Sequence, residues 1–254
     1  MTARLRAIEE TRAVTGTGQN AGMGYLARLF TATEEQNRQA ILALLPAGRG
    51  GKLLDVGTSD GAFTVRVAER LGASQTSGVE LIGEHAATAR ARGVDAVVAN
   101  VDDGLPFEDA RFATVHANQV IEHLSDTDRL LSEIRRVLAP GGLACISTNN
   151  LSSWHNVVSL ALGWQPMPSH ASEELIAGNP LNPERGREHS DAGRVHLRLF
   201  TRRALAEVCA HHGLRPVSLR GAGYYPLPPA LARHAARLDP VHAAYVTGLF
   251  AAPG

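Results

Sequence analysis

Short apolar segments alternate with amphipathic helical segments over residues 52–148 of this 254-residue chain. Each apolar segment is five or six residues long and is bounded by glycine, proline or polar residues, which predicts a strand. Strands that alternate with helices predict a parallel sheet covered by helices on both faces. We expect strands at Lys52–Val56, Thr76–Glu80, Asp95–Asn100, Phe112–Ala117 and Leu143–Thr148, and helices at Ala62–Leu71, Gly83–Arg92 and Asp126–Leu138.

The pattern changes at both ends of the chain. Met23–Phe30 and Glu34–Leu45 predict two short amphipathic helices, so residues 1–50 are expected to form a helical cap. Residues 201–212 predict a helix with Thr201 as N-cap, and Arg215–Arg220 a strand. A final strand or irregular segment is expected after Tyr224-Tyr225-Pro226, and the alanine-rich tail, Pro229–Gly254, is expected to be helical.

Residues 149–195 interrupt the alternation and are rich in proline, glycine, asparagine, serine and histidine. A long irregular insertion in a compact domain is typically a lid or a binding loop. We therefore predict an α/β fold with a doubly wound, mostly parallel seven-stranded sheet and an insertion after the fifth strand. Residues 51–254 are expected to form a single domain.

Composition narrows the function classes. The formal net charge is zero and the pI is near 7.2, so no broad basic surface is available for DNA or RNA. The two cysteines, Cys145 and Cys209, are far apart in sequence and are expected to be buried free thiols in a reducing compartment. Residues 1–10 lack the apolar core of a secretory signal, and no apolar run is long enough to span a bilayer. We expect a cytoplasmic monomer or homodimer.

The turn after the first predicted strand, Asp55-Val56-Gly57-Thr58-Ser59-Asp60-Gly61, is the candidate ligand site, because parallel sheets bind ligands at this strand end. It lacks the Gly-Lys-Ser/Thr ending of a phosphate-binding loop and the G-x-G-x-x-G pattern of a dinucleotide fold. The carboxylate of Asp60 inside the turn would also repel a pyrophosphate.

S-adenosylmethionine (SAM) fits the turn better, because it carries a cation and an amino acid in place of phosphates. Asp55 can hold the ammonium group of its methionine part, directly or through water, and Gly57 allows close backbone approach. Glu80 ends the second predicted strand, where a carboxylate can accept hydrogen bonds from both ribose hydroxyls.

Several segments resemble class I SAM-dependent methyltransferases of the ubiquinone/menaquinone-biosynthesis type. Leu54–Gly61 resembles their first motif, with Ser59 at the place of the usual middle glycine. Leu105–Asp109 with Phe112–Ala117, then Val120–Leu124, and Leu131–Gly142 resemble the segments around their fourth and fifth strands. The resemblance covers about residues 50–150 and implies a Rossmann-like fold and a methyltransferase activity.

The resemblance also implies where the rest of the cofactor binds. Asn100 stands at the place of an aspartate that contacts adenine, and an amide can both accept and donate there. The end of the fourth strand should lie along the methionine part and the methyl group. The expected cofactor-binding residues are Asp55, Gly57, Thr58, Ser59, Gly61, Phe63, Glu80, Leu81, Asn100, Val101, Ala117, Asn118 and Gln119.

Methyl transfer from a sulfonium mainly requires a positioned acceptor, and an oxygen acceptor also benefits from a base. His123 lies just after the fourth strand, and His196 belongs to a His-x-Arg-x-Phe-Thr segment that resembles one in the same broad family. We take His123, His196 and Glu122 as candidate catalytic residues, and His155 and His189 as weaker candidates.

The same residues, with Gln119, resemble the metal site of small-RNA 2′-O-methyltransferases. Gln119 replaces a carboxylate of that site, so a divalent metal is not favoured and no metal ligand is assigned.

The acceptor pocket is expected from residues 149–195 and the pair Tyr224-Tyr225. Trp154, Trp164, Pro166, Met167 and Pro168 would give it apolar walls, which suits a hydrophobic or aromatic small molecule. We expect O-methylation in secondary metabolism. The alternatives are C- or N-methylation, an RNA acceptor, which the neutral charge opposes, and a non-catalytic SAM-binding partner subunit.

Overall fold

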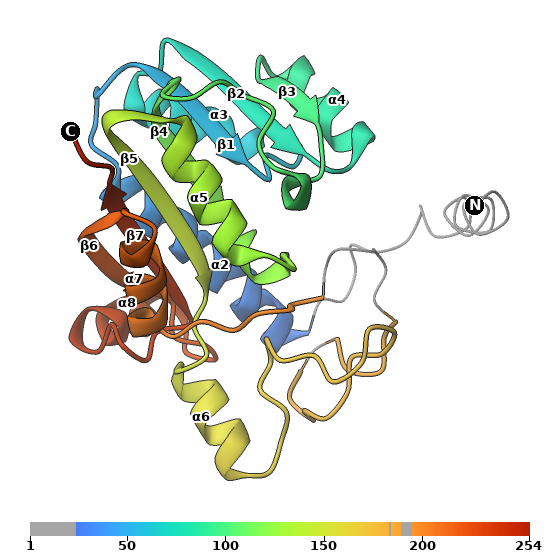
Figure 1. Cartoon of the computed structure of the whole chain (residues 1–254). Coiled ribbons are helices and arrows are strands. Elements are labelled where there is room, and N and C mark those ends of the chain that lie inside the picture. The colour runs from blue at the N-terminus through green and yellow to red at the C-terminus, as the bar shows by residue number, and fades with distance from the viewer. Residues whose placement is uncertain (1–23, 183, 189–194) are drawn as a thin grey trace, which may run out of the picture.

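Seven strands form one sheet in the order β3-β2-β1-β4-β5-β7-β6 (Figure 1). The computed structural model describes residues 24–182, 184–188 and 195–254. Strands β1 to β5 are parallel to one another, and β7 is antiparallel to both β5 and β6. The strands are β1 Lys52–Val56, β2 Gln75–Glu80, β3 Asp95–Val98, β4 Phe112–Asn118, β5 Leu138–Asn149, β6 Arg215–Ala222 and β7 Tyr245–Ala251.

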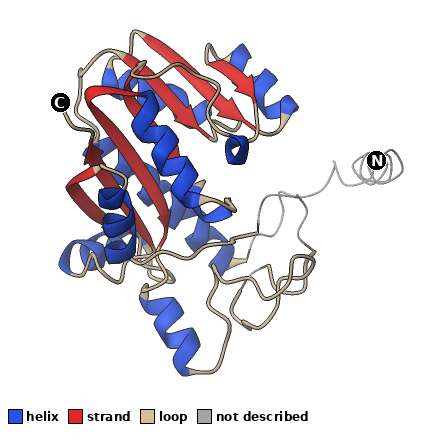
Figure 2. Cartoon of the chain, viewed as in Figure 1, coloured by secondary structure: helices blue, strands red, loops and turns tan. Residues whose placement is uncertain are grey.

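Helices cover both faces of the sheet, as the alternating pattern predicts (Figure 2). One face packs against α2, α3 and α4, and the other against α5 and α7. The helices are α2 Tyr25–Leu44, α3 Ala62–Leu71, α4 Gly83–Ala91, α5 Thr127–Val137, α6 Trp154–Ala161, α7 Arg202–His211 and α8 Pro229–Leu238, with short 3-10 helices η1 Val101–Asp103 and η2 Ile121–His123.

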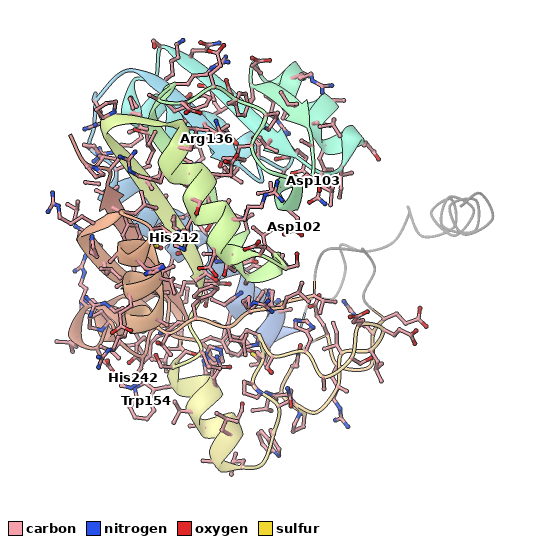
Figure 3. The ribbon with its side chains drawn as sticks, in the orientation of Figure 1. Asp102, Asp103, Arg136, Trp154, His212 and His242 are labelled. Carbon is pink, nitrogen blue, oxygen red and sulfur yellow. The ribbon has the colours of Figure 1, made fainter. Side chains whose placement is uncertain are left out.

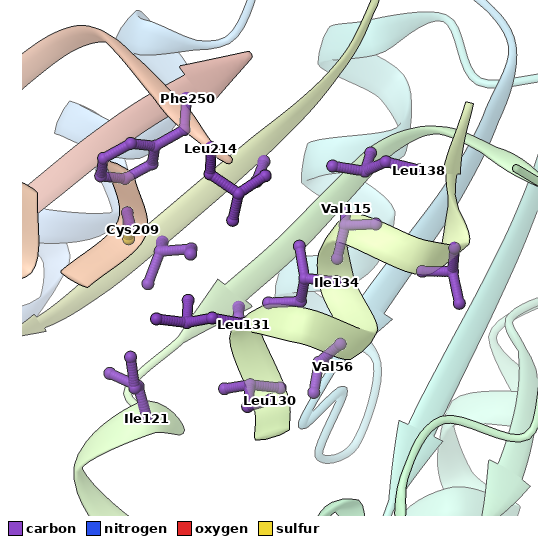
Figure 4. Close-up of a cluster of buried hydrophobic side chains, with 14 of the residues drawn as sticks. Val56, Val115, Ile121, Leu130, Leu131, Ile134, Leu138, Cys209, Leu214 and Phe250 are labelled. Atoms are coloured by element: carbon purple, nitrogen blue, oxygen red, sulfur yellow. The ribbon is translucent and has the colours of Figure 1, made fainter. Parts of the chain in front are cut away.

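The larger core lies between the sheet and helices α5 and α7 (Figure 4). Leu130, Leu131 and Ile134 of α5 are fully buried there, at the i, i+1, i+4 spacing of one helix face. This core fixes β1 and β4 side by side at the centre of the sheet. The strand order reverses between β1 and β4, and ligands of doubly wound sheets bind at the carboxyl ends of strands at such a point.

The N-terminal segment forms one helix, so the prediction of two short helices is wrong. Helix α2 continues through the polar stretch at Thr31 and Thr33. Their hydroxyls donate to the carbonyls of Ala27 (3.2 Å) and Leu29 (2.8 Å) one turn earlier, so the helix satisfies both polar side chains internally.

The prediction of a helical tail is wrong for its last part. Helix α8 is present, but Tyr245–Ala251 forms β7 between β5 and β6. Six of the seven residues of β7 are buried, so the segment lacks the alternation that marks a half-exposed strand. The fifth strand is also longer than expected and begins at Leu138.

The insertion after β5 contains α6, which begins at Trp154 (Figures 1 and 3). The rest of its described residues are turns and irregular structure, with one bridge between Leu175 and Glu188. The chain returns to the body through a bridge between Asn150 and Phe200. Among the described helices, none has the length and apolar character needed to cross a membrane.

Candidate active site

The turn between β1 and α3 depends on two glycines. Gly57 has a φ of +75°, and a Cβ there would lie 2.5 Å from Cγ2 of Val120. Gly61 has a φ of +80°, and a Cβ there would lie 2.9 Å from Cα of Ala89. Only glycine fits both positions without displacing neighbours. The backbone N–H groups of Gly57 and Thr58 both donate to the carbonyl of Val79, which ties the turn to β2.

Ser59 and Asp60 complete the turn. Ser59 adopts the left-handed conformation (φ +50°) that a glycine would take at this place. The carboxylate of Asp60 accepts from the N–H of Ala62 and forms an ion pair with Arg92 (2.6 Å), and these contacts lower its pKa. Asp60 therefore holds the start of α3, and its paired charge opposes a phosphate less than the sequence suggested.

Asp55 is buried beneath this turn, and both of its oxygens have partners within the protein. Oδ1 lies 2.6 Å from Nδ1 of His116 on β4, and Oδ2 accepts from the hydroxyl of Thr64 on α3. The hydroxyl of Thr58 lies 2.6 Å from that of Thr64, which extends the network.

Glu80 lies at the end of β2 and receives two backbone hydrogen bonds. Oε2 accepts from the N–H of Ser59 (2.8 Å) and Oε1 from the N–H of Ile82 (2.9 Å). Each carboxylate oxygen has a second lone pair, so Glu80 retains the capacity to accept from two hydroxyls. Leu81 beside it is 55% exposed, which leaves an apolar surface next to the carboxylate.

Asn100 precedes η1. Its Oδ1 accepts from the N–H of Asp102 (3.0 Å), which caps the 3-10 helix and orients the amide. Val101 is half-buried and packs against the larger core. The side-chain amide of Asn100 and the backbone of Val101 thus lie next to each other on the loop after β3.

Ala117, Asn118 and Gln119 end β4. Ala117 is buried, and Oδ1 of Asn118 accepts from Nδ2 of Asn37 on α2 (3.0 Å). Gln119 has a φ of +57°, and its Nε2 is buried without a hydrogen-bond partner among the described residues. Such an orphaned polar group indicates that a ligand or water completes this place.

A cavity of about 370 Å³ lies over the turn and the ends of β1 and β4. Phe63 forms part of its wall and lies edge-on to His116, with ring centroids 5.5 Å apart. Arg38 of α2 and Arg66 of α3 bring two guanidinium groups to it. The lining residues are Arg38, Asp55, Gly57, Thr58, Ser59, Asp60, Ala62, Phe63, Arg66, His116 and Asn118.

The three candidate catalytic residues come together after β4. One carboxylate oxygen of Glu122 and one ring nitrogen each of His123 and His196 all lie within 4.8 Å of one another. The two imidazole rings are 4.8 Å apart between centroids. The backbone carbonyl of Glu122 accepts from the N–H groups of Leu197 and Arg198, so the segment after the insertion is fixed against η2.

Backbone contacts orient both imidazoles. Nδ1 of His123 lies 3.2 Å from the carbonyl of Val195, and Nδ1 of His196 lies 2.9 Å from the carbonyl of Pro168. A carbonyl only accepts, so each Nδ1 donates and the Nε2 of each neutral ring is the acceptor nitrogen. Nδ2 of Asn149 lies 3.5 Å from Nε2 of His196, which agrees with this arrangement.

Glu122 is 1% exposed, and its Oε2 has no hydrogen-bond partner among the described residues. Burial raises the pKa of its carboxyl to about 7. The group can therefore gain or lose a proton near neutral pH.

Two imidazole nitrogens and one carboxylate within this distance are also a donor set that can hold a divalent ion. The backbone carbonyls behind both rings would suit such a site, since metal-bound histidines commonly donate their other nitrogen.

The residues expected to line the acceptor pocket differ in their burial and in their contacts. Tyr225 is buried and lies edge-on to Phe30 and to His155. Burial lowers the pKa of His155 to about 4, which keeps this imidazole neutral. Tyr224 instead donates to Asp239 (2.8 Å), and Trp154 does the same (3.0 Å). His189 lies outside the described residues.

Several residues of the site were not expected from the sequence. They are Arg38 and Asn37 of α2, Arg66 of α3, His116 of β4 and Asn149 of β5. His116 left a signal, because it is the one polar residue in the run Val115-His116-Ala117 of a strand that the pattern predicts to be buried. The residues of α2 left none, because polar residues on an amphipathic helix are ordinary.

The comparison with known families agrees with this geometry. A family model described as a methyltransferase domain matches residues 28–219, which is most of the chain. The matched region begins within α2 and ends within β6, so it includes the turn, Glu80, Asn100 and the cluster of Glu122, His123 and His196.

Curated relatives are methyltransferases as well. The chain is 28% identical over 228 residues to a malonyl-[acyl-carrier protein] O-methyltransferase of Geobacter sulfurreducens, covering 86% of this chain and 78% of the relative. It is 29% identical over 143 residues to a ubiquinone biosynthesis O-methyltransferase of Idiomarina loihiensis, covering 52% of this chain and 58% of the relative.

Solved structures share the fold. A SAM-dependent methyltransferase of Thermotoga maritima, described as a possible histamine N-methyltransferase, has a TM-score of 0.57 at 19% identity, covering 88% of this chain and 92% of that one. A geranyl diphosphate methyltransferase has a TM-score of 0.54 at 21% identity, covering 93% and 84%.

SAM fits the residues of the turn. The remaining lone pairs of Glu80 match its ribose hydroxyls in chemistry. Its amino-acid group is matched by the unpartnered Nε2 of His116 and by the guanidinium groups of Arg38 and Arg66. The family match, the sheet order and this donor set lead to one conclusion: the chain belongs to the methyltransferase-domain family and is a class I SAM-dependent methyltransferase.

Proposed function

We propose that the protein transfers the methyl group of SAM to a hydroxyl oxygen of a small, hydrophobic or aromatic acceptor. The observation that carries this proposal is the cluster of Glu122, His123 and His196, in which both imidazoles present Nε2 as acceptor. A hydroxyl must lose its proton as it is methylated, and these nitrogens supply a base of suitable strength near neutral pH.

Cofactor binding is assigned to the turn and its surroundings. Glu80 accepts from the ribose hydroxyls, Asn100 and the Val101 backbone contact adenine, and Leu81 lies against the base. Gly57, Thr58, Ser59, Gly61, Phe63 and the end of β4 at Ala117, Asn118 and Gln119 surround the methionine part, with Asp55 beneath it. SAM, when bound, supplies an electrophilic methyl group on a sulfonium.

The chain's own residues then orient the acceptor and take its proton. His123 or His196 receives the hydroxyl proton at Nε2. Glu122 beside them, with a pKa of about 7, stabilises the imidazolium that forms. The carbonyls of Val195 and Pro168 keep each ring in the tautomer that this step needs.

An apolar acceptor is supported by the insertion. Residues 137–172 contain no Asp, Glu, Lys or Arg, and Val158, Leu160 and Leu162 in and beside α6 are about half exposed. This uncharged segment runs through β5 and α6 to Pro168, whose carbonyl contacts Nδ1 of His196. It suits an acceptor with an apolar body, and secondary metabolism offers many such phenols and alcohols.

The test is methylation of a panel of phenols, alcohols, amines, carboxylic acids and activated carbon acids, followed by mass spectrometry. We expect a hydroxyl acceptor to gain one methyl group. His123→Ala and His196→Ala should lower kcat by about 100-fold or more, as removal of a general base does. His234→Ala on the exposed face of α8 is the matched control and should leave turnover unchanged.

Carbon or nitrogen methylation needs less of a base, so turnover on such an acceptor that survives both histidine substitutions would contradict the proposal. SAM binding without turnover on any acceptor class would favour a non-catalytic subunit instead.

A metal-assisted variant of the reaction is the second candidate, favoured by the convergence of the same three donor groups. It predicts one equivalent of a divalent ion after purification in metal-supplemented buffer, and loss of turnover with a chelator. Retention of full activity in the chelator would leave the metal-free base mechanism.

A further inference from the structure

A buried pair of side chains lies beneath the methionine end of the cofactor cavity. His116 is 1% exposed and Asp55 is 3% exposed, and Nδ1 of the imidazole lies 2.6 Å from Oδ1 of the carboxylate. The two residues are register partners on neighbouring strands, so the sheet itself fixes their separation. The first motif of the family includes Asp55 but not His116.

Asp55 lines the cavity but is 3% exposed, and each of its carboxylate oxygens already has a partner inside the protein. Oδ1 is occupied by His116, and Oδ2 accepts from the hydroxyl of Thr64. Thr64 is itself backed by Thr58. An ammonium group that binds Asp55 would share the carboxylate with these two partners.

His116, by contrast, has an unmet hydrogen-bonding group. Its Nε2 is buried and has no partner among the described residues. Because Nδ1 faces a carboxylate, which accepts, Nδ1 donates and Nε2 is the nitrogen left to accept. A buried acceptor without a donor is unfavourable, so a donor from outside the chain is expected there.

The surroundings of His116 fit an amino-acid group. His116 lines the cavity together with Asn118 and with Phe63, whose ring stands edge-on to the imidazole. Arg38 and Arg66 line the same cavity, and Arg66 also forms a salt bridge with Glu35 (3.0 Å). Guanidinium groups suit a carboxylate. The imidazole suits an ammonium, because its Nδ1 faces Asp55 and its Nε2 is left to accept.

We propose that His116 is a cofactor-binding residue that accepts a hydrogen bond at Nε2 from the α-ammonium group of the methionine part, while Asp55 acts as a positioning residue through Nδ1. The inference concerns cofactor binding alone. It is tested without any acceptor, so its failure is distinguishable from failure of the proposed O-methylation.

The experiment measures ligand binding by calorimetry on the full chain and two variants. His116→Asn places an amide where Nδ1 was and keeps a donor for Asp55, but it lacks a group at the Nε2 position. His116→Gln places an amide near the Nε2 position. The probes are S-adenosylhomocysteine, its analogue with hydrogen in place of the amino group, and 5′-methylthioadenosine, which has no amino-acid end.

We expect His116→Asn to weaken S-adenosylhomocysteine binding by at least about tenfold, as loss of a hydrogen bond to a charged group does. Binding of the deaminated analogue and of 5′-methylthioadenosine should change by less than about twofold. His116→Gln should recover part of the loss. Cys145→Ala, at the neighbouring register position on β5, is the matched control and should leave all three affinities unchanged.

Three results would overturn the proposal. Equal weakening of all three probes by His116→Asn would mean that the residue only supports the fold. Weakening of the deaminated analogue together with S-adenosylhomocysteine, but not of 5′-methylthioadenosine, would assign Nε2 to the carboxylate. Unchanged binding of S-adenosylhomocysteine in both variants would exclude any contact.

Discussion

At the scale of single residues, Glu122 shows how burial at the site sets both chemistry and stability. Its carboxyl is fully buried, and the pKa of about 7 compares with an ordinary value of 4.5. The unfolded chain loses this proton at lower pH than the folded protein does. Glu122 therefore lowers the stability of the fold progressively as pH rises from about 4.5 to 7.

The expected size follows from the difference in pKa of about 2.5 units, which corresponds to about 3 kcal/mol. Glu122→Gln removes the titration, so the variant's unfolding free energy relative to wild type should rise by up to about 3 kcal/mol between pH 4.5 and pH 8. Methylation activity should fall at the same time. Urea unfolding at several pH values measures the first effect.

Ile121→Val is the control for this prediction, because it trims a neighbouring buried side chain without removing a titratable group. Its stability difference from wild type should be the same at both pH values. A pH-independent difference for Glu122→Gln would show that the carboxyl does not titrate near neutral pH.

At the scale of elements, one carboxylate helps to attach the start of α6 to the body. Asp239, just after α8, accepts from Nε1 of Trp154, the hydroxyl of Tyr224 and Nδ1 of His242. The indole of Trp154 also lies against His242, with ring centroids 4.6 Å apart. Partial burial opposes ionisation, but these hydrogen bonds hold the pKa of Asp239 down to about 2.

Asp239→Asn should loosen the start of α6, because the amide oxygen alone must replace two carboxylate oxygens as acceptor. We expect faster amide hydrogen exchange in residues 154–161 and little change in β1 or β4. The lowered pKa predicts that the wild-type contacts persist down to about pH 4 and weaken as the pH falls towards 2.

Glu207→Gln is the matched control, since it also neutralises one acidic partner, in an exposed pair with Arg203 on α7. It should leave hydrogen exchange in α6 unchanged. Equal effects of the two substitutions would show that charge alone, and not the contacts of Asp239, controls the helix.

The elements that the sequence predicted well are short apolar or amphipathic segments bounded by glycine, proline or polar residues. The strands from β1 to β5 and the helices between them were found within about two residues, except the start of β5, because these signals are local. Strand β7 was missed because the alanines on both sides of it favour a helix, and its burial on both faces leaves no alternation to oppose that prediction. The sequence predicted two helices in place of α2, because the hydrogen bonds from the hydroxyls of Thr31 and Thr33 to carbonyls one turn earlier are visible only in the structure.

The site shows the same limit. Glu122, His123 and His196 were paired from a resemblance, and the structure brings them together. Arg38 and His116 were missed because their roles depend on which elements the sheet places side by side. Contacts between segments far apart in sequence leave no local pattern, so Arg38 does not stand out from its helix. His116 stands out only as a polar residue in a buried strand, which does not show what it contacts. The expected cytoplasmic location and oligomeric state stay predictions.

At the scale of the whole molecule, Asn37 of α2 connects this helix to strands β5 and β7 and to the cofactor cavity. Its Oδ1 accepts from the hydroxyls of Ser147 on β5 (3.1 Å) and Thr247 on β7 (3.0 Å). Its Nδ2 donates to Oδ1 of Asn118, which lines the cavity. The side chain is 2% exposed, so water does not replace these bonds easily.

Asn37→Leu should therefore affect stability and cofactor binding together. Asn118, Ser147 and Thr247 each lose a hydrogen bond to Asn37, and Ser147 and Thr247 keep only the bond between them. This should lower the unfolding free energy by about 2–4 kcal/mol. Asn118 loses its orientation, so S-adenosylhomocysteine should bind several-fold more weakly. Gln36→Leu separates the two effects, because Gln36 on the same helix donates to Pro229 and does not line the cavity. It should lower stability and leave the affinity unchanged. Equal losses of affinity in both variants would mean that α2 acts on the cavity through its position as a whole and not through the bond to Asn118.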